Sequence, residues 1–230
     1  MVLIQVKKTN KNVLCTRDQI SNTLDTLITC GLARIRQEVC ITEDRDIATI
    51  SWRNHVPGRH NSGKSFLKLE QYAAIYESGA YHCILFDGSI IRVSFKFDES
   101  KLVRENLLFW PAPINIPEDE IDELGIREAL DLHLEGMNSR NEELRMRSPF
   151  RLDFDPSNCR EKHPATHIHM QHEECRISVN GPICFNTFVR LIFQNFYPDQ
   201  RIGVIDELET IHYSGYDECK NAYVRLNGIA

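Results

Sequence analysis

Histidines are concentrated in one short stretch of the chain. Residues 163–176 read His-Pro-Ala-Thr-His-Ile-His-Met-Gln-His-Glu-Glu-Cys-Arg and contain four of the nine histidines. If residues 166–170 form a β-strand, the side chains of His167 and His169 point to the same face, because side chains alternate along a strand. Two imidazoles on one face can hold a metal ion together, or can act as base and acid around a bond to be broken.

One interpretation of this stretch is a metal site. His167, His169 and His172 offer the nitrogen donors that zinc and other divalent transition metals prefer, and Cys159 or Cys175 could be a fourth ligand. The His-x-His-x-x-His spacing is similar to that of metallo-β-lactamase-type hydrolases. Those enzymes have an aspartate directly before the third histidine, where this chain has a glutamine, and only a short tail follows for further ligands.

A second interpretation is a metal-independent site that acts on phosphodiesters. His167 is then the general base, His163 is the acid or an orienting group, and Arg176 binds the phosphate. The proline after His163 favours an extended backbone at the entrance of the predicted strand. A third interpretation is structural, with histidines that satisfy buried carbonyl groups or line a protein interface. The residues alone leave all three open.

The strands that must position these residues follow from hydrophobic patterns. Residues 81–86 and 90–97 are apolar runs on either side of Asp87-Gly88, a dipeptide typical of a two-residue hairpin turn. With the next apolar run they predict an antiparallel meander near 81–110. Residues 150–154 alternate as a strand does.

Helical spacing predicts the rest of the architecture. The first helix is expected to begin at the capping-box pattern Thr16–Gln19. No linker divides the sequence, so we predict a single α+β domain over residues 1–230, in which an antiparallel sheet packs with several helices. The helices are expected near residues 16–30, 66–78, 119–135 and 185–197.

Composition and charge limit the class of protein. The 230-residue chain carries a net charge of −6 at pH 7 and has no apolar run long enough to span a membrane. Its N-terminus has the reverse order of a secretory signal, and its eight cysteines form no Cys-x-x-Cys pair, so we predict a cytoplasmic protein without a membrane partner. The negative charge argues against non-specific DNA coating, although basic residues between 140 and 162 leave room for a nucleic-acid-binding patch.

A nucleotide-binding motif in the sequence lacks the context that it needs. Residues 58–65, Gly-Arg-His-Asn-Ser-Gly-Lys-Ser, match the P-loop pattern, which requires a buried strand before the first glycine. Polar residues and Pro57 stand there instead, and the candidate magnesium ligand Asp87 lies in a hairpin. We therefore expect no ATP or GTP binding.

Several segments, taken in order, resemble one bacterial family. They are residues 84–97, 107–113, 150–155, 163–169, 175–179 and 194–197. The set spans roughly residues 80–200 and is similar to a family known only as domain of unknown function number twenty-two-ninety. The resemblance implies no established activity and no catalytic residues, and it implies accessory-type proteins, some with defence-related gene neighbours. It places His163, His167 and Arg176 in the most distinctive segment of the family, and it implies that other residues are tolerated in the place of His169.

These observations lead to two functional hypotheses. The first is a nuclease-like or other phosphodiester-acting hydrolase with a nucleic-acid partner and a site at His163, His167 and Arg176. The alternative is a non-enzymatic interaction or regulatory subunit, with structural histidines and the acidic residues 118–135 as its docking face for a protein. An enzyme should present the histidines and Arg176 in a concave pocket, whereas a binding module should bury the histidines and expose an apolar or acidic patch elsewhere.

Overall fold

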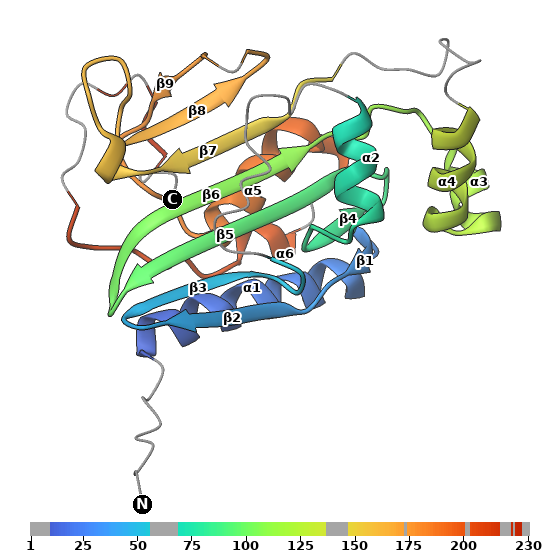
Figure 1. The fold of residues 1–230 in the computed structure, drawn as a ribbon. Coiled ribbons are helices and arrows are strands. Elements are labelled where there is room, and N and C mark those ends of the chain that lie inside the picture. The colour runs from blue at the N-terminus through green and yellow to red at the C-terminus, as the bar shows by residue number, and fades with distance from the viewer. Residues whose placement is uncertain are drawn as a thin grey trace, which may run out of the picture.

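A computed structural model describes residues 10–55, 69–136, 147–172, 174–200, 203–216, 222 and 224–226. The described strands form one nine-stranded sheet, and Figure 1 shows helices on both of its sides. The strands are β1 (Ala33–Arg36), β2 (Val39–Asp44), β3 (Ile47–Trp52), β4 (Cys83–Leu85), β5 (Ile90–Asp98), β6 (Lys101–Trp110), β7 (Phe150–Phe154), β8 (Thr166–Met170) and β9 (Ile177–Ser178). The helices are α1 (Lys11–Thr29), α2 (Leu69–Glu77), α3 (Glu118–Leu124), α4 (Ile126–Gly136), α5 (Phe185–Phe196) and α6 (Gly203–Asp206), with short 3-10 turns at Pro156–Asn158 and Pro198–Gln200.

The named strands of the sheet pair only in the antiparallel sense. Their order is β1-β4-β5-β6-β7-β8-β9, and β3 pairs with both β2 and β5. Strands β4, β5 and β6 form the meander that the sequence predicts near 81–110. The predicted α+β fold with an antiparallel sheet is confirmed.

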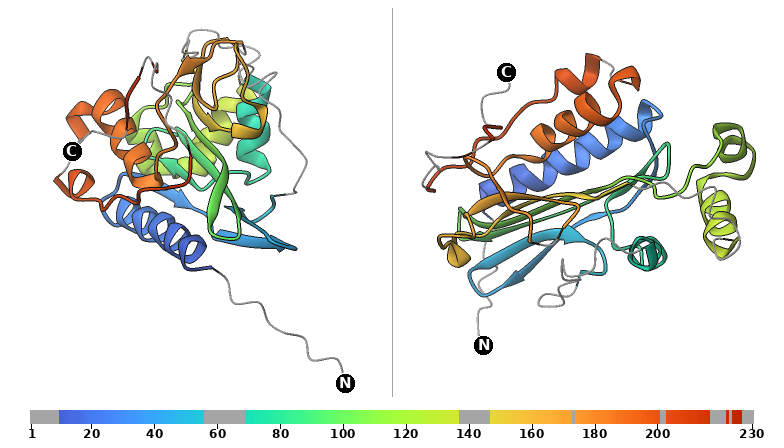
Figure 2. Two further views of the ribbon diagram at one scale, coloured as in Figure 1. Left: turned by 90° about the vertical axis from the view of Figure 1, so that its left-hand side faces the viewer. Right: turned by 90° about the horizontal axis from the view of Figure 1, so that it is seen from above.

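Both faces of the sheet carry helices. Helices α1 and α5 lie side by side across one face (Figure 2), where Leu24 and Phe188 are fully buried together with strand residues such as Phe95. On the opposite face, α2 and the α3–α4 pair cover one end of the sheet, around Tyr72 and Leu130. The remainder of that face is polar, and it carries the candidate site. No described helix is long and apolar enough to cross a membrane.

Helix α1 begins earlier than predicted, so the capping-box start at Thr16 is wrong. Asn10 is the N-cap, and its side-chain oxygen accepts a hydrogen bond of 2.9 Å from the backbone N–H of Asn12. Thr16 is fully buried inside the helix, and its hydroxyl lies 3.3 Å from that of Tyr213. Val13 extends the apolar stripe one turn toward the N-terminus, so packing favours the longer helix.

The acidic segment predicted as one helix over 119–135 forms two. Gly125 has a φ of 82°, which ends α3 and turns the chain before α4 begins. Ile121 and Ala129 face the core, whereas Leu132 is 54% exposed. For the helix predicted over 66–78, the structure shows α2 from Leu69 to Glu77, and residues 66–68 lie outside the described part. The P-loop match at 58–65 lies outside it as well.

The hairpin between β4 and β5 has a three-residue loop, not the predicted two-residue turn. Leu85 and Ser89 pair across it, and the backbone N–H of Gly88 donates to the carbonyl of Leu85 at 3.1 Å. Gly88 adopts a φ of 85°, in the left-handed region. Three-residue hairpin loops need one residue in that region, and here it is Gly88. The hydroxyl of Tyr72 donates to the Gly88 carbonyl at 2.6 Å and ties the loop to α2.

A histidine side chain fills a gap along one edge of β5. That edge pairs with β4 at Ile90 and Ile91 and with β3 from Phe95 onward. Between them the backbone N–H of Val93 donates to Nδ1 of His82 at 3.2 Å. His82 is fully buried and must be neutral to accept this bond, and burial lowers its pKa to about 3.

This contact makes stability depend on pH. A histidine with a lowered folded-state pKa stabilises the fold fully above its unfolded pKa, near 6.5, and loses that contribution as the pH falls toward 3. From His82 alone we expect a loss of about 2 kcal/mol between pH 7 and pH 5. In His82→Asn, the side-chain oxygen can replace Nδ1 as acceptor but does not titrate. Urea unfolding of this variant should therefore show a loss of unfolding free energy between pH 7 and pH 5 that is smaller than that of the wild type by that amount. An unchanged pH slope would contradict this assignment.

Candidate functional site

Strands β7 and β8 bring the polar residues of the site together. Because side chains alternate, the large apolar residues of β7 face the core under α5, and Arg151 and Asp153 point to the opposite face. In the antiparallel register, Asp153 lies opposite His167 and Arg151 lies opposite His169. Four side chains of two adjacent strands therefore meet on one face of the sheet.

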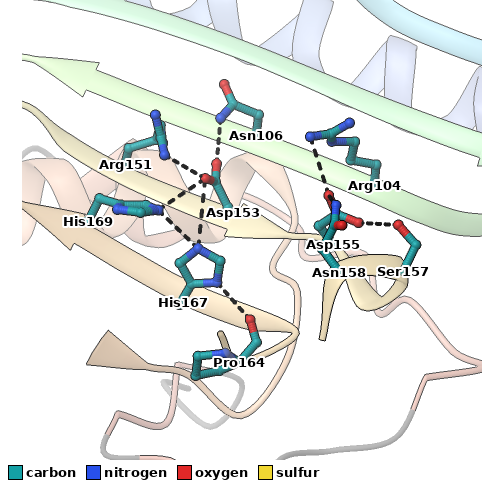
Figure 3. A network of polar contacts seen from close by, with 10 residues as sticks. All are labelled: Arg104, Asn106, Arg151, Asp153, Asp155, Ser157, Asn158, Pro164, His167 and His169. Carbon is teal, nitrogen blue, oxygen red and sulfur yellow. Dashed lines mark hydrogen bonds and ion pairs between the residues drawn. The ribbon is translucent and has the colours of Figure 1, made fainter. Parts of the chain in front are cut away.

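The histidines and the aspartate are in contact with one another (Figure 3). Nε2 of His169 lies 3.0 Å from Nε2 of His167 and 3.4 Å from Oδ2 of Asp153. Nε2 of His167 lies 4.0 Å from the same carboxylate oxygen. His167 and His169 are 1% and 3% exposed, whereas the Asp153 side chain keeps 18% of its surface exposed. The cluster is therefore buried on its histidine side and partly open at its carboxylate.

Backbone contacts determine which nitrogen of His167 carries the proton. Its Nδ1 lies 2.8 Å from the carbonyl oxygen of Pro164, which can only accept, so Nδ1 is the donor. The Nε2 lone pair of the neutral ring is therefore directed at His169, whose Nε2 must donate to it. Burial lowers the pKa of His167 to about 4 and favours this neutral form. Within the part of the chain that the structure describes, the buried Nδ1 of His169 has no hydrogen-bond partner.

Asp153 is held in its ionised form. Arg151 lies 2.9 Å from its Oδ2, and the side-chain amide of Asn106 donates to its Oδ1. Burial alone would raise the pKa of Asp153, but the contact with His169 and the charge of Arg151 outweigh it and lower the pKa to about 2. Asp153 thus contributes one negative charge to the cluster near neutral pH.

A second arginine adds positive charge to the same face. Arg92 of β5 is 7% exposed, and its Nε and one terminal nitrogen have no hydrogen-bond partner among the described residues. Its guanidinium carbon lies 5.0 Å from the centroid of the Trp52 ring. Burial and the nearby charge of Arg151 lower the pKa of Arg92 to about 10. A buried guanidinium with unused donors is suited to receiving an anion.

His163 and Arg176 extend the cluster toward the surface. The rings of His163 and His167 contact edge to face, with centroids 4.6 Å apart. His163 is half-buried, and burial together with the charges of Arg176 and Arg160 lowers its pKa. The structure therefore brings His163, His167 and His169 into one row, with Arg176 close to its outer end.

The turn after β7 holds His163 in place. The carboxylate of Asp155 accepts hydrogen bonds from Ser157 at 2.6 Å and from Asn158 at 2.7 Å (Figure 3). Arg160 and His163 then pair through their backbones. This pairing returns the chain to the start of β8 with the His163 ring beside His167.

His172 lies apart from this cluster. It is exposed in the turn after β8, where its Nδ1 accepts a hydrogen bond of 3.2 Å from the backbone N–H of Glu174. Within the part of the chain that the structure describes, the group of possible metal ligands that includes His167 and His169 is completed by Asp153, not by His172, Cys159 or Cys175.

Four residues of the site escaped the sequence analysis: Arg92, Asn106, Arg151 and Asp153. The alternation of residues 150–154 predicted the strand that carries Arg151 and Asp153. Their pairing with β8, however, depends on a register that no local pattern reveals.

The burial of the site matters for its interpretation. A groove of about 1020 Å³ lies along α1 and residues 207–211, and a cavity of about 50 Å³ lies near Pro182 and Tyr213. Neither is lined by the histidine row or Arg176. Buried histidines are what we expect of a binding module. Nitrogens of His169 and Arg92 that have no hydrogen-bond partner in the described residues, however, are not typical of satisfied structural side chains.

These residues define an α+β protein with a buried cluster of histidine, aspartate and arginine on one face of an antiparallel sheet. The chain belongs to the family DUF2290, described as an uncharacterized conserved protein, whose model matches residues 32–220. This match confirms the resemblance seen in the sequence and includes every residue of the cluster. No curated protein and no solved structure matches the chain.

Removal of the Asp153 carboxylate should destabilise the protein. Asp153→Ala removes the carboxylate that pairs with the Arg151 guanidinium, and breaking a buried ion pair from one side costs about 3–5 kcal/mol. Because the Arg151 side chain is 14% exposed, we expect a value at or below the lower end of that range. Urea unfolding measures the loss, and Asp98→Ala, at an exposed position on β5, is the control. Equal losses in the two variants would show that the pair contributes little.

Proposed function

We propose that the protein is a hydrolase that acts on phosphodiester bonds at the histidine row. The observation that carries this proposal is the meeting of Asp153, His167 and His169 with Arg92 and Arg151 on one face of the sheet. Imidazoles that contact one another beside buried guanidinium groups provide proton transfer and anion binding at one place.

The charges of the site favour an anionic substrate. Arg151 is paired with Asp153, but Arg92 retains unused donors, and Arg160 and Arg176 lie around His163. A phosphodiester presents one negative charge and two non-bridging oxygens, which suit planar guanidinium groups. The face therefore fits a phosphodiester better than a neutral ester or amide.

The geometry changes the roles that the sequence suggested. His167 is buried with its free nitrogen directed at His169, so it does not meet a substrate directly. His163, half-buried at the outer end of the row, takes the proton from the attacking water or gives one to the leaving oxygen. Water forms the new P–O bond, the ester P–O bond breaks, and the products are a phosphomonoester and an alcohol. Arg176 contributes charge beside His163.

The test compares two histidines of the same stretch. His163→Ala should lower kcat/KM by about 10²–10⁴-fold on bis(p-nitrophenyl) phosphate or on single-stranded RNA and DNA oligonucleotides, because general acid–base catalysis is lost. His172→Ala, exposed and outside the row, should keep the wild-type rate. Assays run with zinc, manganese, magnesium or a chelator. A folded wild-type protein without hydrolysis in any of them, or full activity of His163→Ala, overturns the proposal.

The competing function is a non-enzymatic interaction subunit, and two observations favour it. His167 and His169 are buried, and Leu132 is 54% exposed on the acidic α3–α4 pair. The charge of these helices would suit a partner with a basic surface. This hypothesis predicts that the protein hydrolyses no phosphodiester. It also predicts that the protein binds a partner with a basic surface, that salt weakens this binding, and that Leu132→Ala weakens it as well.

A further inference from the structure

We propose that Asp153, His167 and His169 form a binding site for one divalent transition-metal ion of the zinc class. The inference deepens the proposed function. Only the catalytic role of the ion rests on that function, because metal binding itself is measured without turnover. It replaces His172, the third ligand suggested by the sequence, with an aspartate from the neighbouring strand.

The donor atoms are close to the spacing that such an ion requires. Zinc binds imidazole nitrogen at about 2.0–2.1 Å and carboxylate oxygen at about 2.0–2.2 Å, so two ligands at angles of 90–109° lie about 2.9–3.5 Å apart. The distances of 3.0 Å between the two histidines and 3.4 Å between His169 and Asp153 satisfy this. The 4.0 Å between His167 and Asp153 must shorten by about 0.5 Å or more, so binding of the ion requires the carboxylate to move toward His167.

The ligands are mounted on a rigid frame. All three stand on strands β7 and β8, which pair directly. His167 donates its Nδ1 proton to the carbonyl of Pro164, an outer contact that keeps Nε2 available for a metal. For His169 Nε2 to ligate the ion, the proton of this ring must move from Nε2 to Nδ1, a change of tautomer that leaves the strands in place.

The donor set favours transition metals over calcium or magnesium. Two imidazoles and one carboxylate match zinc, iron, cobalt or manganese, whereas calcium and magnesium prefer sites built of oxygen. Three protein ligands leave coordination positions for water or substrate, as catalytic rather than structural sites do.

Nearby arginines determine what else must bind. Arg151 contacts Asp153 at Oδ2, the oxygen nearest the histidines, and Arg92 adds a second positive charge. A divalent ion therefore enters a region that already has excess positive charge. An oxyanion on the open coordination positions offsets that charge and occupies the free donors of Arg92. Metal and oxyanion should thus bind with positive coupling, which by linkage is the same in both directions.

A calorimetric titration of the metal-free protein with zinc chloride tests the site. The wild type should bind one ion with the ligands named here. Asp153→Asn and His169→Gln should each weaken binding by more than about tenfold, and His172→Ala should bind as the wild type does. Cobalt(II) provides a second readout, because its visible absorption spectrum depends on the nitrogen and oxygen ligands. The spectrum of the cobalt-bound protein should differ from that of the wild type in Asp153→Asn and His169→Gln, but not in His172→Ala.

Each outcome decides the proposal. Equal zinc affinity of wild type and His169→Gln, both folded by circular dichroism, overturns it, as does loss of binding in His172→Ala. If Asp153→Asn does not fold, His169→Gln carries the test, together with the position of the anomalous zinc signal in a crystal.

Sulfate, which does not precipitate zinc, tests the coupling between metal and oxyanion. It should raise zinc affinity in the wild type and raise it less in Arg92→Ala, and no effect of sulfate contradicts the coupling. Binding without hydrolysis refutes the proposed function alone, and hydrolysis in chelator without binding refutes the metal site alone.

Discussion

The candidate site depends on the two-residue period of β7 and β8 in a sheet whose two faces differ. One face of β7 packs against the helical layer, and the other carries charge. A shift of register by one residue would place Asp153 among the phenylalanines of the core and Phe154 beside the histidines. The apolar packing under α5 therefore aligns the polar side chains on the other face. The positions of the cluster side chains therefore depend on the packing of the core as much as on their own contacts.

The overall charge of the chain conceals this local arrangement. The net charge is −6, yet the acidic residues of α3 and α4 stand at one end of the molecule, and arginines surround the histidine row. Field and affinity at a site depend on the charges nearest to it, so a negative protein can present a positive face to an anion. The low pKa of Asp153 reflects the same surroundings.

The sequence predicted those elements that depend on local periodicity. The meander, the strands over 150–154 and 166–170, and the helix α5 follow from the spacing of apolar residues. The break at Gly125 depends on one backbone angle, and the start of α1 at Lys11, after the N-cap Asn10, depends on tertiary packing. The sequence analysis missed both. For the site, alternation was enough to place His167 and His169 on one face. Asp153 and Arg92 could not be linked to them, because strand order and register bring together residues far apart in the chain.

The imidazole of His82 takes the place of a backbone group in the sheet, and this limits how the position can vary. Only a side chain with an acceptor where Nδ1 lies can satisfy the Val93 N–H without moving β3 or β4. Asparagine or aspartate meets that requirement, whereas leucine or phenylalanine of similar size leaves a buried donor unpaired. Among relatives with the same strand order, this position should therefore vary by hydrogen-bonding ability rather than by hydrophobicity. Substitution patterns there would then report on the continuity of the sheet, independently of any activity.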